Sequence, residues 1–292
     1  MLSRGRGFAI AGLLIVLMAS AFVIRVDNFR KSRAYTIDEI VYYQLARGLV
    51  QTPVRYNTRE YAAFLAAEQP EILPLPAYFT APLFKHPPVF PFLVAQSLRV
   101  FGDRPLSGVY VAAGFGVLLI LLGYLLGRLF FNESVGMWAA FVLWLDPVNI
   151  ICSQRVWMET TLSFWMLLGL LLFGAAVKYA RGNYFIYSGV AVGLAGLTKY
   201  PGLLMTLVFV LYGLVERDVC FRNRKFWLGL ALPFLLLLPW FYWNGMVYGW
   251  GIFARIGMLH GLGNYWPMIL AGLAGSVGVC IVWRLSDRKS VV

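Results

Sequence analysis

Long runs of hydrophobic residues, separated by short polar segments, dominate the chain. Several of these runs approach or exceed the ~18 residues that suggest a membrane-spanning helix. The pattern therefore predicts an all-α polytopic membrane protein with about eight transmembrane helices. The predicted spans cover Phe8–Ile24 and about 108–127, 134–150, 159–177, 184–198, 201–215, 226–243 and 265–283.

The first run follows Arg4 and Arg6, as the core of a secretory signal or of a membrane anchor would. Ala19-Ser20-Ala21 offers small residues for signal cleavage, but the apolar run continues past them. The run is longer than the roughly 7–15 residues of a signal-peptide core. An uncleaved signal anchor with a cytoplasmic N-terminus is therefore favoured over a cleaved signal peptide.

Residues 27–107 are rich in acids and prolines and hold no long apolar run, which predicts a large external loop. Within it, Thr36-Ile37-Asp38-Glu39 matches a capping box, in which Thr and Glu side chains close the first turn of a helix. Apolar residues follow at helical spacing up to Gly48, a residue that favours a helix end. A second helix is predicted over Val89–Phe101, with Gly102 as its stop. Both are predicted to be amphipathic helices in the plane of the membrane surface.

Composition supports a membrane protein. Of the 292 residues, 60% are hydrophobic and 13% are charged, and the mean hydropathy is +0.72. Soluble domains have about 45–50% apolar and about 25% charged residues, so soluble, disordered and coiled-coil chains are excluded. A net charge of +12 would indicate nucleic-acid binding in a soluble protein. Here we interpret it as the charge that fixes membrane topology, and we expect no nucleic-acid partner.

The distribution of Lys and Arg decides whether Val89–Phe101 crosses the membrane. If it does not cross, the short cytoplasmic loops hold twelve cations and the short external loops hold three. If it crosses, ten of the twelve move outside, against the positive-inside rule. The first arrangement is therefore predicted, with both termini cytoplasmic. The twelve are Arg4, Arg6, Arg128, Lys178, Arg181, Arg217, Arg222, Arg224, Lys225, Arg284, Arg288 and Lys289, and the three are Arg155, Lys199 and Arg255.

This topology divides the chain into four parts. They are a signal-anchor span at 1–26, an external loop with juxtamembrane helices at 27–107, a seven-helix membrane bundle at 108–285 and a cytoplasmic tail at 286–292.

Charged residues that suit group transfer gather on the external side. A carboxylate activates a hydroxyl group, and cations hold a phosphate. Asp38 and Glu39 lie in the first external loop, and Glu159 lies at the start of the fourth span. The cations and the imidazole on the same side are Lys85, His86, Arg155 and Lys199.

Each of these residues also has a purely structural interpretation. Glu39 closes the capping box, and Asp38 favours the positive end of the helix. Arg155 and Glu159 stand four residues apart, a spacing at which they pair with each other on one helix face. Asp146 is costly inside a membrane and indicates either a function or a helix end. Roles as ordinary interface or turn residues are the alternatives for Lys85, His86 and Lys199.

Four motifs, in this order, resemble family 39 of the glycosyltransferases, within the GT-C superfold. The family includes protein O-mannosyltransferases and the aminoarabinose transferases of lipid A. The stretch from Tyr35 to Tyr43 is similar to the Asp-Glu motif of the family. Its other motifs are similar to Lys85-His86-Pro87-Pro88-Val89-Phe90 with Phe101-Gly102, to Arg155-x-x-x-Glu159, and to Leu197-Thr198-Lys199-Tyr200-Pro201-Gly202.

The resemblance implies a sugar donor on a polyprenyl phosphate and a hydroxyl acceptor on a protein, lipid or glycan. The reaction would take place on the non-cytoplasmic face of a plasma or endoplasmic-reticulum membrane, among its lipids, and usually with inversion at the anomeric carbon. Asp38 matches the catalytic acid of the family, and Glu39 and Glu159 match its supporting acids. The charge pattern, more than the motifs, assigns the donor phosphate to Lys85, His86, Arg155 and Lys199.

The resemblance covers about residues 8–215, and members of the family usually run much longer. Two alternatives therefore stay open: a non-catalytic or truncated membrane subunit that binds polyprenyl phosphate, and a transporter for lipid-linked sugars. A partner subunit that supplies missing spans fits the first alternative. Acids on the outer face favour the enzyme over the transporter. No cofactor is assigned; some relatives use a divalent metal, but Asp38-Glu39 is not a DxD pair of metal ligands.

Overall fold

The computed structural model describes residues 2–31, 35–60 and 83–251, and every regular element in these residues is a helix. This confirms the all-α prediction. The elements, in chain order, are α1 (Leu2–Lys31), α2 (Ile37–Gln51), α4 (Val89–Phe101), α5 (Pro105–Phe130), α6 (Glu133–Leu145), α7 (Pro147–Ser153), α8 (Glu159–Lys178), α9 (Asn183–Thr198), the 3₁₀ helix η3 (Tyr200–Leu203), α10 (Leu204–Val215), α11 (Arg217–Cys220) and α12 (Arg224–Tyr248).

Among the described residues, four helices are long and apolar enough to cross a membrane: α1 from Gly7, α5, α8 and α12. The pair α6 and α7 makes a fifth if it is one span, broken by a 56° bend. The segment of η3 and α10 is apolar but shorter, and α9 has 16 residues. The predicted span at 265–283 lies outside the described residues. The count of eight spans therefore stays a prediction.

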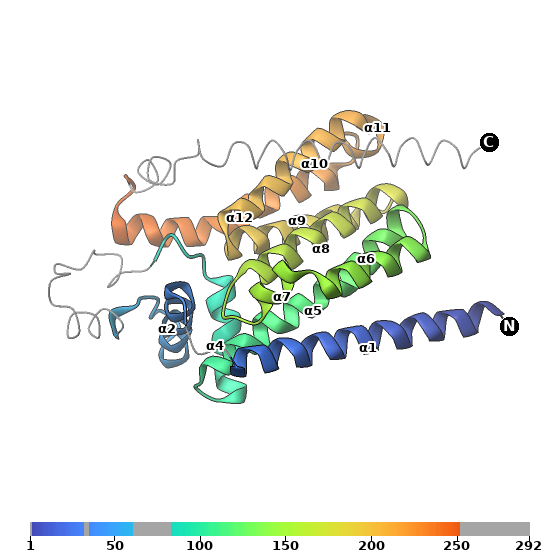
Figure 1. Ribbon diagram of the computed structural model, residues 1–292. Helices are drawn as coiled ribbons and strands as arrows, with labels where there is room; N and C mark the ends of the chain where they lie inside the picture. Colours follow the sequence, from blue (N-terminus) through green and yellow to red (C-terminus); the bar gives the residue numbers. More distant parts are fainter. Residues whose placement is uncertain (1, 32–34, 61–82, 252–292) are drawn as a thin grey trace.

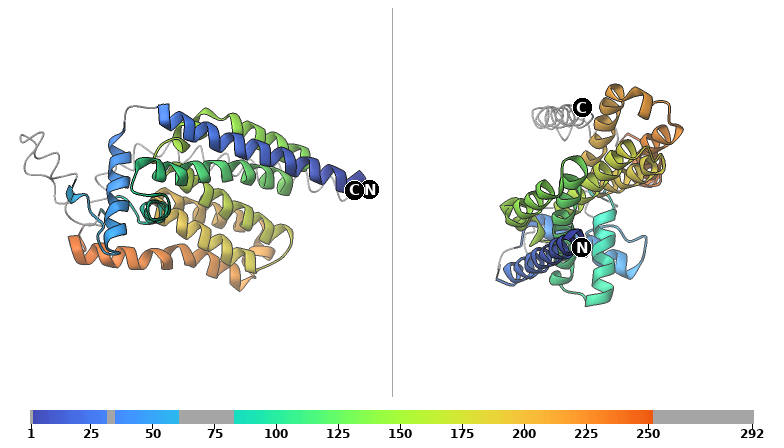
Figure 2. Two further views of the ribbon diagram at one scale, coloured as in Figure 1. Left: turned by 90° about the horizontal axis from the view of Figure 1, so that it is seen from below. Right: turned by 90° about the vertical axis from the view of Figure 1, so that its right-hand side faces the viewer.

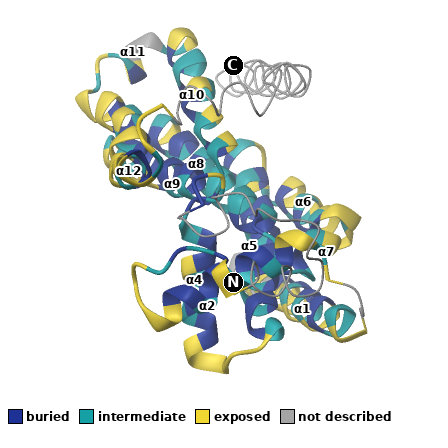
Figure 3. Cartoon of the chain, turned by 90° about the vertical axis from the view of Figure 1, so that its left-hand side faces the viewer, coloured by how far each residue is buried: buried dark blue, intermediate teal, exposed yellow. Residues whose placement is uncertain are grey.

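The long helices form a bundle, and α2 and α4 run across one end of it (Figures 1 and 2). The helix α5 is central: 56% of its most apolar stretch is buried inside the protein, against 17% for α1. Seen from the end that carries α2 and α4, buried residues gather where these two helices meet α5 (Figure 3). The end that α2 and α4 cover is called the capped end below.

The helix α4 has the bounds that the sequence predicted, and it ends at Gly102, whose φ of 91° suits glycine. The helix α2 corrects the prediction, because it continues past Gly48 to Gln51. Gly48 lies inside the helix for another reason. A Cβ atom at this position would lie 2.5 Å from the carbonyl oxygen of Arg55, so the glycine permits a close approach of the following chain segment.

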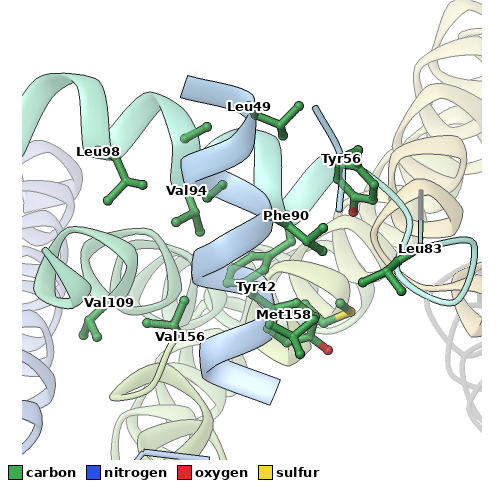
Figure 4. Close-up of a cluster of buried hydrophobic side chains, with 14 of the residues drawn as sticks. Tyr42, Leu49, Tyr56, Leu83, Phe90, Val94, Leu98, Val109, Val156 and Met158 are labelled. Carbon is green, nitrogen blue, oxygen red and sulfur yellow. The ribbon is translucent and has the colours of Figure 1, made fainter. Parts of the chain in front are cut away.

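A buried cluster holds α2 and α4 on the bundle (Figure 4). Tyr42 and Leu45 of α2 pack with Phe90 and Val94 of α4. The connection between α7 and α8 contributes Val156 and Met158, and α5 and α12 contribute Val109 and Trp240. The capped end is therefore built from segments distant in the sequence.

Candidate functional site

The N-terminus of α2 is closed by the predicted capping box, which the structure confirms. The backbone N–H of Thr36 donates to Glu39 Oε2 at 2.8 Å, and the backbone N–H of Glu39 donates to Thr36 Oγ1 at 3.4 Å. The reciprocal bonds satisfy two donors that a helix start leaves without partners. They fix Asp38, which lies between the two, in the first turn of the helix.

Glu39 also binds the connection between α7 and α8. Its Oε2 atom lies 3.0 Å from Arg155 Nη1, and its Oε1 atom accepts a hydrogen bond from the backbone N–H of Val156 at 3.2 Å. Trp157 Nε1 donates to Thr36 Oγ1 at 2.9 Å. Glu39 is 2% exposed. Its carboxylate is thus a buried junction between α2 and a segment more than a hundred residues away.

The sequence alternative that Arg155 and Glu159 pair with each other is wrong. Arg155 pairs with Glu39, and Glu159, in the first turn of α8, pairs with Lys199 Nζ at 3.0 Å. Lys199 lies between α9 and η3, so this ion pair joins α8 to the turn that follows α9. Both partners are about 40% exposed, at 39% and 43%, so water screens the pair.

Asp38 is exposed, although the next residue is buried. Successive helical residues point in directions about 100° apart, so Asp38 faces away from the junction that Glu39 makes. Tyr42 lies one turn further along α2 and is 3% exposed. Burial, together with the negative charges of Asp38 and Glu159, raises the pKa of Tyr42 above its usual range. The Tyr42 hydroxyl therefore stays protonated near both acids.

Sequence reasoning did not single out Tyr42. Its ring lies 5.1 Å from the ring of His86 in an edge-to-face contact, which brings the Lys85–His86 turn to the same face of α2 as Asp38. Lys85 is exposed on this turn. The signal in the sequence was the spacing of four residues between Asp38 and Tyr42, which puts both on one helix face.

Arg25 is a second residue that sequence reasoning missed, because it looks like the polar end of the anchor segment. It is fully buried, and its Nε donates to Ser153 Oγ at 2.6 Å. Burying a charged side chain costs free energy, so such a residue usually has a structural or functional role. The bond ties α1 to the end of α7, two residues before Arg155. Arg25 thereby supports the segment that holds Glu39.

Asp146 has a structural role at the bend between α6 and α7. Its carboxylate accepts hydrogen bonds from the backbone N–H groups of Val148 at 3.1 Å and Asn149 at 3.2 Å. It therefore caps α7. The helix-end interpretation of Asp146 is confirmed.

The capped end thus brings together the predicted residues from four parts of the chain. Asp38 and Glu39 come from α2, the Lys85–His86 turn precedes α4, Arg155 and Glu159 flank the start of α8, and Lys199 follows α9. In the part of the chain that the structure describes, no three His, Cys, Asp or Glu side chains are placed to hold a metal ion. The capped end therefore carries the exposed carboxylate of Asp38, the protonated hydroxyl of Tyr42 and the side chains of Lys85 and Lys199.

Comparison with known proteins points to one family. The family model described as Dolichyl-phosphate-mannose-protein mannosyltransferase matches residues 85–243. The match begins at the Lys85–His86 turn and reaches into α12, beyond the limit near residue 215 that the motifs indicated. The chain is also 25% identical over 213 residues to the putative mannosyltransferase YkcB of Bacillus subtilis (strain 168), across 73% of this chain and 27% of that protein.

Two solved structures share the fold of the GT-C glycosyltransferases with this chain. One is ArnT from Cupriavidus metallidurans bound to undecaprenyl phosphate, with a TM-score of 0.63 and 22% identity over 80% of this chain and 42% of that chain. The other is the oligosaccharyltransferase AglB from Archaeoglobus fulgidus, in complex with an inhibitory peptide and a dolichol-phosphate. Its TM-score is 0.60, with 16% identity over 96% of this chain and 37% of that chain. The chain thus spans less than half the length of each of these proteins.

Proposed function

Because the chain belongs to the family of dolichyl-phosphate-mannose-protein mannosyltransferases, we propose that it transfers a sugar from a polyprenyl-phosphate donor to a hydroxyl group of a protein, lipid or glycan. The chain is an integral membrane protein of a glycosyltransferase family. The observation that carries the proposal is the exposed carboxylate of Asp38 at the capped end, on a helix that Glu39 locks to the residues before α8.

In this proposal, Asp38 is the base for the acceptor. The acceptor oxygen attacks C1 of the sugar, and Asp38 takes its proton as the new bond forms. The bond between C1 and the phosphate oxygen breaks, and its electron pair leaves with the polyprenyl phosphate. The configuration at C1 is inverted, because attack and departure lie on opposite sides.

Lys85 and Lys199 stabilise the phosphate that leaves. The phosphate is negatively charged in the bound donor and gains charge as the bond to C1 breaks, and fixed ammonium groups lower the energy of both states. Glu159 keeps Lys199 in place through the 3.0 Å ion pair. His86 and Arg155 are the other residues assigned to the donor phosphate, while Glu39 holds the helix that carries Asp38.

Replacing either lysine with alanine should weaken the use of the donor. A charge-assisted hydrogen bond to phosphate contributes roughly 1.5–3 kcal/mol, so the KM for the lipid-phosphate donor should rise by about 10–100-fold in Lys85→Ala or Lys199→Ala. Steady-state kinetics against donor concentration measure this. Arg181→Ala is the matched control, because Arg181 is an exposed cation at the opposite end. A donor KM that stays at the wild-type value in both lysine variants would put the phosphate elsewhere.

The proposal puts the capped end on the non-cytoplasmic face and both chain termini in the cytoplasm. The helix α1 begins at the opposite end of the bundle (Figure 1). Positive charge in short loops marks the cytoplasmic side. Among the residues whose exposure the structure describes, the exposed cations at that opposite end include Arg128, Lys178, Arg181, Arg222, Arg224 and Lys225.

Cysteine labelling tests this orientation. In a variant whose native cysteines are replaced by serine, a membrane-impermeant maleimide added from outside should modify Glu60→Cys and leave Arg222→Cys unmodified. Both positions are polar, and they lie at opposite ends of the helix bundle. After the membrane is permeabilised, both should react. Modification of Arg222→Cys in sealed cells, with Glu60→Cys protected, would reverse the topology and the side of the site.

A second candidate function is a subunit that binds polyprenyl phosphate and that a partner chain completes. The chain spans 27% of the length of YkcB and 42% of that of ArnT, so the activity of a whole enzyme stays a proposal for it.

One experiment separates the two candidates. Purified chain in lipid nanodiscs receives undecaprenyl-phosphate mannose and a mixture of hydroxyl acceptors, and the release of undecaprenyl phosphate is measured. Release by the chain alone supports the enzyme. If the chain alone binds the donor without releasing undecaprenyl phosphate, and a co-expressed partner restores the release, the result supports the subunit. Neither binding nor release would contradict both.

A further inference from the structure

The turn that carries Lys85 and His86 has no regular secondary structure, and buried side chains from other segments hold its backbone. Tyr56 lies in the segment after α2 and is 1% exposed. Its hydroxyl lies 2.6 Å from the carbonyl oxygen of His86 and 3.2 Å from that of Pro87, and it donates to these oxygens. Burial raises the pKa of Tyr56 well above its usual range, so the hydroxyl remains a donor at physiological pH.

A second phenol holds the other side of the turn. The hydroxyl of Tyr200 donates to the carbonyl oxygen of Phe84 at 2.6 Å, and the two rings lie 5.2 Å apart. The backbone is thus bound at the residue before Lys85 and at the residue after it. Because Tyr200 directly follows Lys199 in the chain, the same contact joins the turn of Lys85 to the turn of Lys199.

The indole of Trp240 connects the two phenols. Its Nε1 donates to the hydroxyl of Tyr200 at 2.9 Å, and its ring makes an edge-to-face contact with Tyr56 at 5.3 Å. The hydrogen bonds therefore run from Trp240 through Tyr200 to the carbonyl oxygen of Phe84. Tyr56 and Trp240 both belong to the buried cluster at the capped end, in which Figure 4 labels Tyr56.

This arrangement bears on how a phosphate is bound. A lysine side chain is flexible, and a lysine on a loose turn loses much conformational freedom when it binds an anion. Fixing the backbone beforehand lowers that cost, so a lysine on a held turn binds a phosphate more tightly.

We propose that Tyr56, Tyr200 and Trp240 form a clamp of positioning residues, which sets Lys85 and Lys199 at a fixed spacing for one phosphate of a polyprenyl phosphate. The inference rests on the proposed function, because that function assigns the two lysines to the donor phosphate. The clamp residues do not contact the phosphate. They act through the backbone of the Lys85–His86 turn.

The test measures binding of undecaprenyl phosphate to the full chain in detergent micelles. Tyr56→Phe and Tyr200→Phe remove only a hydroxyl group, and each should raise the Kd by about 2–10-fold, the effect of losing one hydrogen bond. The thermal unfolding midpoint reports folding separately. Tyr124→Phe is the matched control, because Tyr124 is a buried phenol whose hydroxyl binds Glu133 at 3.4 Å at the opposite end.

A double-mutant cycle separates positioning of Lys85 from a general effect on folding, because it measures the coupling between the two mutations in the Kd. Tyr56 binds the Lys85–His86 turn, so if the clamp acts through Lys85, Tyr56→Phe should not raise the Kd further in a Lys85→Ala background. Equal effects of Tyr56→Phe with and without Lys85 would overturn the clamp. A Kd unchanged by Tyr56→Phe and Tyr200→Phe, while Lys85→Ala raises it, would also overturn the clamp and leave the proposed function standing. A Kd unchanged by Lys85→Ala and Lys199→Ala would overturn the phosphate assignment itself, and with it the clamp.

Discussion

Replacing Asp38 with asparagine should lower the rate of sugar transfer by about 10²–10⁴-fold, the usual contribution of a positioned general base. A hydroxyl group is a poor nucleophile at neutral pH, and asparagine cannot take its proton. The side chain at position 38 is exposed, while the neighbouring Glu39 makes the bonds that lock the helix. The amount of membrane-inserted protein and its unfolding midpoint should therefore stay at wild-type values.

Asp27→Asn provides the control for this measurement. Asp27 is another acid near the same end of the bundle, its side chain is 50% exposed, and it pairs with Lys31 in the next helical turn. Single-turnover kinetics at saturating donor isolate the chemical step in both variants. If wild-type chain transfers sugar and Asp38→Asn does so at the same rate, another group takes the proton, and the proposed role of Asp38 is wrong.

Replacing Glu39 with glutamine should have the largest effect on stability. The change leaves Arg155 beside a neutral side chain and weakens the capping box at the start of α2. Removing one partner of a buried ion pair costs roughly 3–5 kcal/mol. Because Arg155 is 22% exposed and water compensates it in part, we expect about 2–4 kcal/mol here. Thermal or denaturant unfolding in detergent measures the loss.

Glu159→Gln is the matched comparison, since it removes the acid of the half-exposed pair with Lys199. Pairs of that kind contribute about 0–1 kcal/mol, so the variant should unfold close to wild type. Its rate of sugar transfer should fall although its free energy of unfolding is nearly unchanged, because Lys199 loses the partner that positions it. Equal losses in the free energy of unfolding would contradict the prediction that the buried Glu39 stabilises the fold more than the half-exposed Glu159 does.

Local features of the capped end were predictable from the sequence because local spacing decides them. Thr36 and Glu39 form the capping box that their three-residue separation predicts. The helix over Val89–Phe101 begins after two prolines and stops at a glycine with positive φ, and neither event depends on distant contacts. The grouping of the charged residues at one end followed from loop charge, which acts on each span separately.

The partners of the charged residues were not predictable in the same way. Arg155 has one carboxylate four residues away and another 116 residues away, and it binds the distant one. Sequence spacing favours the near partner only if residues 155–159 form one continuous helix. In the structure α8 begins at Glu159, so Arg155 lies before the helix and points to α2 instead. The burial of Arg25 likewise depends on the position of Ser153 in the folded chain, which the bend at Asp146 determines.

The junction at Glu39 also has a consequence for biosynthesis. A ribosome that adds about 5–20 residues per second needs roughly 6–23 s to make the residues between Glu39 and Arg155. The capping box of α2 needs only Thr36 and Glu39, so it can form during that time without the distant partner. The bond between Glu39 and Arg155 forms only after the start of α8 has been made, and Trp240, which binds Tyr200, is made 40 residues after Tyr200. The capped end, whose first helix α2 is made early, is therefore completed only after α12 has been made.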